Sequence, residues 1–191
     1  YRERLIINDL KKWKESTSRK PLILLGARQV GKTYILKEFG KREFQNMVYV
    51  NCHGNEFADN LFRDLSVTRI VSEIERYYEA KVIAGKTLLV FDEIQEVHNG
   101  IASLKYFCED MPELHVVVAG SLLGITLRED ESYPVGKVTT LRMYPMTFAE
   151  YLMACGRPQL LEMLNGLEWE SMKAMDGLLV ELLRQYYFTG G

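Results

Sequence analysis

The residues best suited to chemistry form one stretch near the start of the chain, Gly26-Ala27-Arg28-Gln29-Val30-Gly31-Lys32-Thr33. They fit the pattern G-x-x-x-x-G-K-[ST] at every fixed position, and this pattern forms a phosphate-binding loop between a strand and a helix. The glycines let the backbone curl so that its N–H groups point at phosphate oxygens. Lys32 would contact the β- and γ-phosphates, and the hydroxyl of Thr33 would bind Mg²⁺. We therefore predict a nucleotide site formed by residues 26–33 and by Tyr34, which follows them.

Two carboxylates follow a second apolar run, Leu88-Leu89-Val90-Phe91. Asp92 and Glu93 stand at its carboxyl end, where open parallel sheets bind their ligands. We expect Asp92 to hold Mg²⁺ opposite Thr33, and Glu93 to orient and polarise the attacking water. The alternative is a strand that simply ends in polar residues. The phosphate loop, about sixty residues earlier, favours the catalytic interpretation.

A third polar group ends the apolar run 114–119, where Gly120 precedes Ser121. In sheets of this type, that strand lies between the phosphate-loop strand and the carboxylate strand. The hydroxyl of Ser121 would then be near the γ-phosphate and able to donate a hydrogen bond. The alternative is a turn serine, because Gly-Ser pairs are common in loops. The predicted catalytic residues are thus Lys32, Glu93 and Ser121.

The elements that must position these residues alternate between strand and helix. Apolar residues at helical spacing or in short runs locate them. Gly40 is placed to end the helix after the phosphate loop. The alternation predicts an α/β fold, a parallel sheet with helices on both faces. We expect strands near 22–25, 47–52, 86–92, 114–121 and 138–143, and helices near 2–14, 34–39, 67–78, 104–111, 147–154 and 169–187.

Composition limits the classes of protein to consider. The 191 residues are 47% hydrophobic and 26% charged, which suits one buried core and argues against disorder. The net charge of −2 gives no electrostatic case for nucleic acid or an anionic membrane as a partner. The cysteines and histidines lack the spacing of a disulfide framework or a zinc site. The odd number of cysteines therefore favours reduced thiols in a cytoplasmic protein, and no apolar run reaches the roughly 18 residues of a membrane helix.

Four motifs carry a family resemblance: GARQVGKT, LLVFDEIQ, VVVAGS and YPVGKVTTLRMYPMTFAEYL, in this order. They resemble the AAA+-type ATPases of bacteria and archaea. More narrowly, they are similar to ATP-binding proteins whose AAA domain precedes a C-terminal domain of unknown function. The resemblance implies a three-layer P-loop NTPase fold with sheet order 5-1-4-3-2, and ATP and Mg²⁺ as ligands. It implies that residues 26–33 are Walker A, Asp92 and Glu93 are Walker B, and Ser121 is sensor 1.

The resemblance also predicts how the chain is organised. Residues 1–20 would be an N-terminal helix and connector, 21–155 the nucleotide-binding core, and 156–191 a helical segment leading to a truncated C-terminal region. The chain begins with Tyr1, and we expect it to be a piece of a longer protein with an appended domain. A homo-oligomer is compatible with this class. The choice of ATP over GTP depends on the resemblance and on the lack of an N-K-x-D guanine motif.

Two departures from the family pattern bear on function. Many relatives have Gly-Arg before the fifth strand, whereas this chain has Gly136-Lys137, and lysine lacks the planar fork that clamps phosphate. Arg128 and Arg142 are other candidates for a trans-acting arginine, although each is more typical of a surface or strand-end residue. Sensor 1 is often Asn, and Ser121 reaches less far, which predicts slow hydrolysis.

Three hypotheses follow. The chain is an ATPase that couples hydrolysis to a change of shape, an ATP-gated switch with little turnover, or part of a DNA-associated regulator whose recognition elements lie elsewhere.

Overall fold

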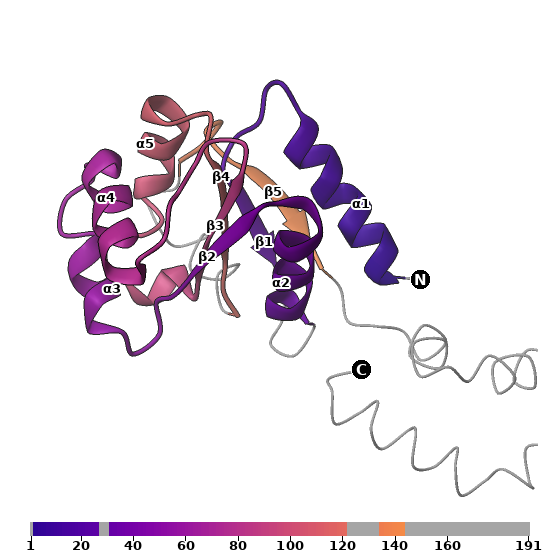
Figure 1. The fold of residues 1–191 in the computed structure, drawn as a ribbon. Helices are drawn as coiled ribbons and strands as arrows, with labels where there is room; N and C mark the ends of the chain where they lie inside the picture. Colours follow the sequence, from indigo (N-terminus) through magenta and orange to yellow (C-terminus); the bar gives the residue numbers. More distant parts are fainter. Residues whose placement is uncertain (1, 27–30, 122–133, 144–191) are drawn as a thin grey trace, which may run out of the picture.

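In the part of the chain that the structure describes, five parallel strands form a single sheet in the order β2-β3-β4-β1-β5 (Figure 1). The computed structural model describes residues 2–26, 31–121 and 134–143, so the helices predicted at 147–154 and 169–187 lie outside the described residues. The sheet order, read from the other edge, is the predicted 5-1-4-3-2. The strands are β1 (Leu22–Leu25), β2 (Asn46–Asn51), β3 (Thr87–Asp92), β4 (His115–Ala119) and β5 (Thr139–Arg142).

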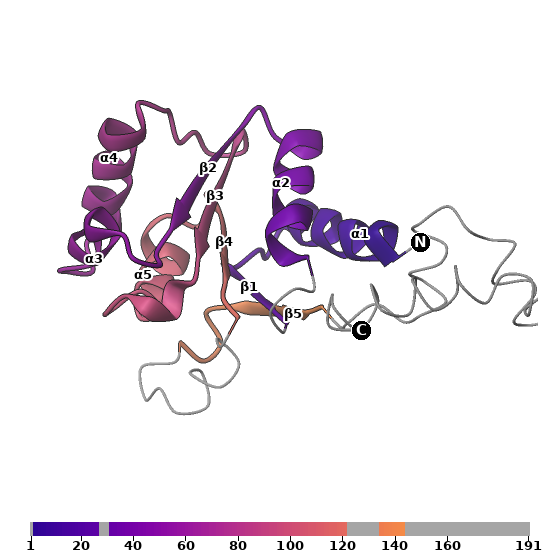
Figure 2. The same ribbon diagram turned by 90° about the horizontal axis from the view of Figure 1, so that it is seen from below.

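Helices cover both faces of the sheet, which confirms the three-layer prediction (Figure 2). One face carries α1 (Arg2–Glu15) and α2 (Lys32–Glu43). The other carries α3 (Glu56–Leu61), α4 (Val67–Tyr78) and α5 (Ser103–Asp110), and a 3₁₀ helix η1 (Ile94–Glu96) follows β3. None of the helices in the described ranges has the length and apolar character needed to cross a membrane.

The core is divided in two by the sheet because side chains alternate between its faces. All of β3 is buried, as expected for a central parallel strand. Leu89 and Phe91 pack toward α3, α4 and α5, whereas Leu88 and Val90 pack toward α1 and α2. Asp92 follows Leu88 and Val90 in this alternation, so its carboxylate points to the side of the sheet that α2 occupies.

Helix α2 extends beyond the predicted stop at Gly40, and that prediction is wrong. The helix continues to Glu43, and Gly40 lies buried within it. A Cβ built at Gly40 would come 2.7 Å from Sδ and 3.0 Å from Cβ of Met47. The glycine therefore allows close approach between α2 and β2, and it does not end the helix.

The segment between β2 and β3 includes two helices. The second of them, α4, covers the predicted range 67–78. The residues before it form the separate short helix α3. Asn55 caps this helix, because its side-chain oxygen accepts a hydrogen bond from the N–H of Ala58. Arg69 of α4 donates to the carbonyl of Leu61 at 2.7 Å and ties the two helices together. The spacing of apolar residues in the sequence does not reveal hydrogen bonds between a side chain and the backbone.

Candidate functional site

The predicted phosphate loop lies between the end of β1 and the start of α2. Gly31 immediately precedes α2 and has a φ of +87°, a left-handed conformation that favours glycine. The first N–H groups of a helix lack partners within the helix, so this end of α2 can bind an anion. Ala27, Arg28, Gln29 and Val30 of the prediction lie outside the described residues.

Lys32 begins α2 and turns back toward the loop. Its Nζ donates to the carbonyl oxygen of Gly26 at 2.5 Å, and its side chain is buried. Burial lowers the pKa of Lys32, and the negative charges of Glu93 and Asp92 oppose this shift. The ammonium therefore lies near both predicted carboxylates, at the carboxyl edge of the sheet.

Thr33 and Asp92 meet although they are far apart in the sequence. The hydroxyl of Thr33 donates to Oδ2 of Asp92 at 3.0 Å, which joins the first turn of α2 to the end of β3. The other oxygen, Oδ1, accepts the N–H of Glu93 at 2.9 Å. The structure thus brings together the two residues predicted to bind metal.

These two residues fit a magnesium ion that is also held by phosphate. A hydroxyl and a carboxylate are hard oxygen ligands, and Mg²⁺ is usually bound by one or two carboxylates together with substrate phosphates and water. Within the described ranges, no three His, Cys, Asp or Glu side chains come together as a metal cluster. The donors present therefore suit a cation that arrives with a nucleotide better than a dedicated protein cage.

Glu93 and Ser121 are also brought together. The N–H of Ser121 lies 3.3 Å from each carboxylate oxygen of Glu93, and its Oγ lies 3.3 Å from Oε2. Strand β4 lies between β1 and β3, as predicted, and this places the two strand ends side by side. A hydroxyl donor therefore lies next to the predicted water-activating carboxylate.

Sequence reasoning missed two residues of this site. The hydroxyl of Tyr49, on β2, donates to Oδ2 of Asp92, and burial and the Asp92 carboxylate raise the pKa of this tyrosine. Gln95 donates from Nε2 to Oε2 of Glu93 at 2.5 Å. Tyr49 belongs to a strand that we predicted from the sequence, and Gln95 is the last residue of the motif LLVFDEIQ. Period-two alternation places Tyr49 on the same face as Asn51, but not beside Asp92.

Of the other predicted residues, Lys137 lies away from the site, because it precedes β5 at the amino edge of the sheet. The side chain of Tyr34 is 57% exposed on the first turn of α2, so its backbone N–H is the group suited to the loop. Lys137 pairs with Glu109 of α5 at 3.3 Å, and Arg142 is exposed on β5. Arg128 lies outside the described residues.

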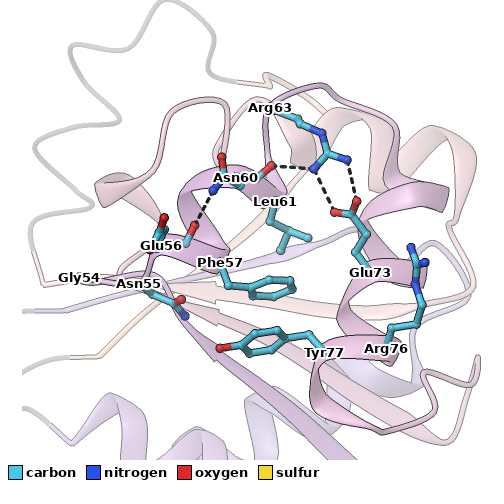
Figure 3. A pocket seen from close by; sticks show the side chains of 10 residues that line it. All are labelled: Gly54, Asn55, Glu56, Phe57, Asn60, Leu61, Arg63, Glu73, Arg76 and Tyr77. Carbon is cyan, nitrogen blue, oxygen red and sulfur yellow. Dashed lines mark hydrogen bonds and ion pairs between the residues drawn. The ribbon is translucent and has the colours of Figure 1, made fainter.

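A separate pocket of about 940 Å³ opens between α3 and α4 (Figure 3). It is lined by the stacked rings of Phe57 and Tyr77, whose centroids are 3.8 Å apart, and by the ion pair of Arg63 and Glu73. None of the residues that line it belongs to the predicted nucleotide site.

Fold and site together define a P-loop nucleotide-binding domain. A family model described as an AAA domain matches residues 18–152, well over half of the chain, and the chain belongs to this family. The class predicted from the sequence motifs, an AAA+-type P-loop ATPase, is thereby confirmed. No curated protein sequence matches the chain.

Two solved structures are similar to the chain. The Aeropyrum pernix ORC1 protein in complex with DNA is similar with a TM-score of 0.50 and 19% identity, over 80% of this chain and 47% of that one. The Aeropyrum pernix ORC2 protein, in its ADP form, is similar with a TM-score of 0.45 and 16% identity, over 83% of this chain and 51% of that one. The chain thus spans about half the length of these two proteins. At this identity, the likeness concerns the fold alone.

Proposed function

We propose that this domain binds ATP with Mg²⁺ at the carboxyl ends of β1 and β3, and that it hydrolyses the γ-phosphate bond. Lys32 and the backbone N–H groups of residues 26–31 would bind the phosphates. Thr33 and Asp92 would hold the cation, which when bound neutralises charge on the β- and γ-phosphate oxygens.

The observation that supports this proposal most strongly is the contact between Thr33 and Asp92 at 3.0 Å. A hydroxyl from the first turn of α2 and a carboxylate from the end of β3 converge on one point. Lys32 lies close enough for the charges of Asp92 and Glu93 to act on its pKa. The site therefore combines two oxygen groups suited to the metal, the ammonium of Lys32, the second carboxylate of Glu93 and the N-terminus of α2. A magnesium-bound triphosphate requires polar groups of these kinds.

Glu93 is the residue proposed to act on the attacking water. Its carboxylate can accept a hydrogen bond from water and orient it toward the γ-phosphate. Ser121 would donate its hydroxyl toward the phosphate or the water, and Lys32 would stabilise charge on the phosphate oxygens. In this proposal, the turnover drives a change of shape that an appended domain can sense.

Two substitutions test the proposal at successive steps. We expect Lys32→Ala to abolish binding of Mg-ATP, because the ammonium on the phosphates is lost. We expect Glu93→Gln to retain binding but lose turnover, because an amide cannot serve as a base. Calorimetric titration with Mg-ATP and release of inorganic phosphate measure the two steps.

Two variants serve as controls for charge and side-chain type. Lys41→Ala removes an exposed lysine in the last turn of the same helix. Glu113→Gln neutralises an exposed carboxylate in the loop before β4. Both should behave as the wild type. Turnover in Glu93→Gln equal to the wild-type rate would remove Glu93 from its role, and a wild type that binds no Mg-ATP at millimolar concentration would overturn the whole proposal.

A second candidate function, an ATP-gated switch with little turnover, is favoured by the hydrogen bonds of Glu93. Ser121 and Gln95 both donate to Oε2 of its carboxylate, so this oxygen is already engaged by the protein. In a switch, ATP binding alone would change the domain and hydrolysis would be slow. Tight binding of Mg-ATP, combined with steady-state phosphate release that Glu93→Gln leaves unchanged, would identify it.

DNA association is not part of this proposal. The DNA in the similar ORC1 complex is bound by that protein, and the likeness to it extends to the fold alone. The net charge of −2 provides no excess of cations for duplex phosphates.

A further inference from the structure

We propose that Tyr49 is a positioning residue for the metal ligand Asp92, holding its carboxylate ready for the magnesium ion. The inference rests on the proposed function, because it assigns Asp92 to the cation. It adds a further strand, β2, to a site otherwise formed from the ends of β1, β3 and β4.

Strand register places Tyr49 within reach of Asp92. On the β2–β3 ladder, Asn51 pairs with Asp92 and Tyr49 pairs with Val90. Tyr49 and Asp92 are therefore diagonal neighbours on one face of the sheet, a separation that an aromatic side chain can span. The tyrosine ring runs along the sheet toward its carboxyl edge, where the hydroxyl donates to Oδ2.

The carboxylate of Asp92 is held at both oxygens. Oδ1 accepts the N–H of Glu93 at 2.9 Å, whereas Oδ2 accepts the hydroxyls of Thr33 and Tyr49. Thr33 is itself a proposed ligand, so its hydroxyl must also serve the cation. Tyr49 is then the side chain that fixes Oδ2 without being a ligand.

The ring of Tyr49 is held in turn by its surroundings. It is half-buried and packs against the core cluster beneath α1 and α2. Nζ of Lys37, on α2, lies 5.1 Å from the ring centroid, a cation–π contact. Because the ring is fixed on both sides, the hydroxyl is positioned by the fold and not by Asp92 alone.

Residues that orient a metal ligand contribute measurably to metal affinity. Loss of such a partner typically weakens metal affinity by about 10- to 100-fold. Removal of the Tyr49 hydroxyl should therefore weaken the response to Mg²⁺, while the contacts of Lys32 and the loop amides with phosphate stay intact.

The test compares Tyr49→Phe with the wild type in two measurements. ATP binding is titrated by calorimetry in EDTA and then over a series of Mg²⁺ concentrations, and Mn²⁺ binding with ATP is followed by electron paramagnetic resonance. We expect the Mg²⁺ and Mn²⁺ concentrations at half saturation to rise about 10- to 100-fold. Binding of metal-free ATP should be essentially unchanged, because Tyr49 interacts with Asp92 and Thr33, which are proposed to hold the cation, whereas Lys32 and the loop amides are proposed to bind the phosphates.

A control and a double variant make the result specific. Tyr77→Phe removes a hydroxyl from the exposed ring on α4, away from the site, and should match the wild type. In an Asp92→Asn background, Tyr49→Phe should have no further effect on metal dependence, because the ligand that it positions is already lost.

The outcomes separate this inference from the function on which it rests. Unchanged metal dependence in Tyr49→Phe, with a wild type that binds Mg-ATP, overturns the positioning role alone. An equal loss of metal-free and metal-bound ATP affinity also overturns it, because Tyr49 would then act on the site as a whole. A wild type that binds no nucleotide overturns the proposed function and the inference together.

Discussion

At the residue scale, Glu93 combines backbone strain with a carboxylate that neighbouring side chains hold by hydrogen bonds. Its φ of +53° lies in the left-handed region, which costs a non-glycine residue on the order of 1–3 kcal/mol. Strain of this kind persists where surrounding contacts fix the residue. Here they are the hydrogen bonds from Ser121 and Gln95 to the Glu93 carboxylate. The conformation aims the side chain across the end of β4, next to Ser121.

Gln95 is the residue best placed to restrain Glu93. Its Nε2 donates to Oε2 of Glu93, whereas its Oε1 is buried without a hydrogen-bond partner among the described residues. Gly120 makes room for this amide, because a Cβ there would collide with Oε1. The amide therefore competes with water for the oxygen that would activate it.

We expect Gln95→Leu to raise the rate of phosphate release roughly tenfold. A hydrogen bond to a charged group contributes about 1.5 kcal/mol or more, and its loss would free Glu93 to engage water. Leucine has a similar shape and leaves no buried acceptor without a partner, so the fold should be retained. Single-turnover phosphate release measures the effect. A slower rate than the wild type would show instead that Gln95 holds Glu93 in its productive position.

At the element scale, α2 can approach β2 closely because residue 40 is a glycine and has no side chain. Gly40 lies within the helix, and Met47 fills the space that a Cβ would occupy. The sequence suggested a helix stop because glycine is common after the last turn of a helix. The reason for this glycine lies instead in a strand residue that packs against it, which the helix pattern does not contain.

We expect Gly40→Ala to destabilise the domain by about 1–2 kcal/mol. Alanine improves helix propensity by up to about 1 kcal/mol, but overpacking a core costs about 1–3 kcal/mol. The contact with Cβ of Met47 makes repacking difficult, because that atom is fixed to the strand. Urea denaturation measures the change. In a Met47→Ala background the same substitution should become neutral or stabilising, and a loss of stability that persists there would contradict the steric explanation.

At the scale of the whole molecule, α1 is attached to the sheet by contacts that span the chain. Arg19 donates to the carbonyls of Lys14, Pro112 and Glu113, which joins the end of α1 to the loop before β4. His115, the first residue of β4, packs edge-on against Trp13 of α1, with 5.6 Å between ring centroids. Its Nε2 lies 3.3 Å from the carbonyl of Lys14.

The burial of His115 predicts how stability depends on pH. Burial, together with the nearby charges of Arg19 and Lys14, lowers the pKa of His115 to about 4. The unfolded chain, with a histidine pKa near about 6.5, binds the proton more readily. Stability from the neutral imidazole is therefore fully present above about pH 6.5 and is lost as the pH falls toward about 4.

We expect the free energy of unfolding to fall by about 2–3 kcal/mol between about pH 6.5 and pH 4 because of His115 alone. Urea denaturation at several pH values measures this slope. His115→Leu should flatten it, even if the variant is less stable at neutral pH, because leucine does not titrate. His98→Leu removes an exposed histidine and should leave the slope unchanged. An equal slope in His115→Leu would assign the acid sensitivity to other groups.

The phosphate loop, the two carboxylates and the alternation of strands and helices could all be predicted from the order of residues. Each depends on residues that are neighbours in the chain, such as Gly31 beside Lys32 or the apolar run before Asp92. Fixed spacing and local periodicity express these features directly. The family resemblance supplied the order of the strands, which local patterns alone do not contain.

The meeting of distant side chains could not be predicted in this way. The hydroxyl of Tyr49 reaches Asp92 only because β2 and β3 pair in one register, and the amide of Gln95 lies against Gly120 only because β3 and β4 are neighbours in the sheet. Gly40 remains helical because Met47 packs against it. These contacts depend on a few ångströms of placement between separate elements, and that placement is set by the packing of the whole core.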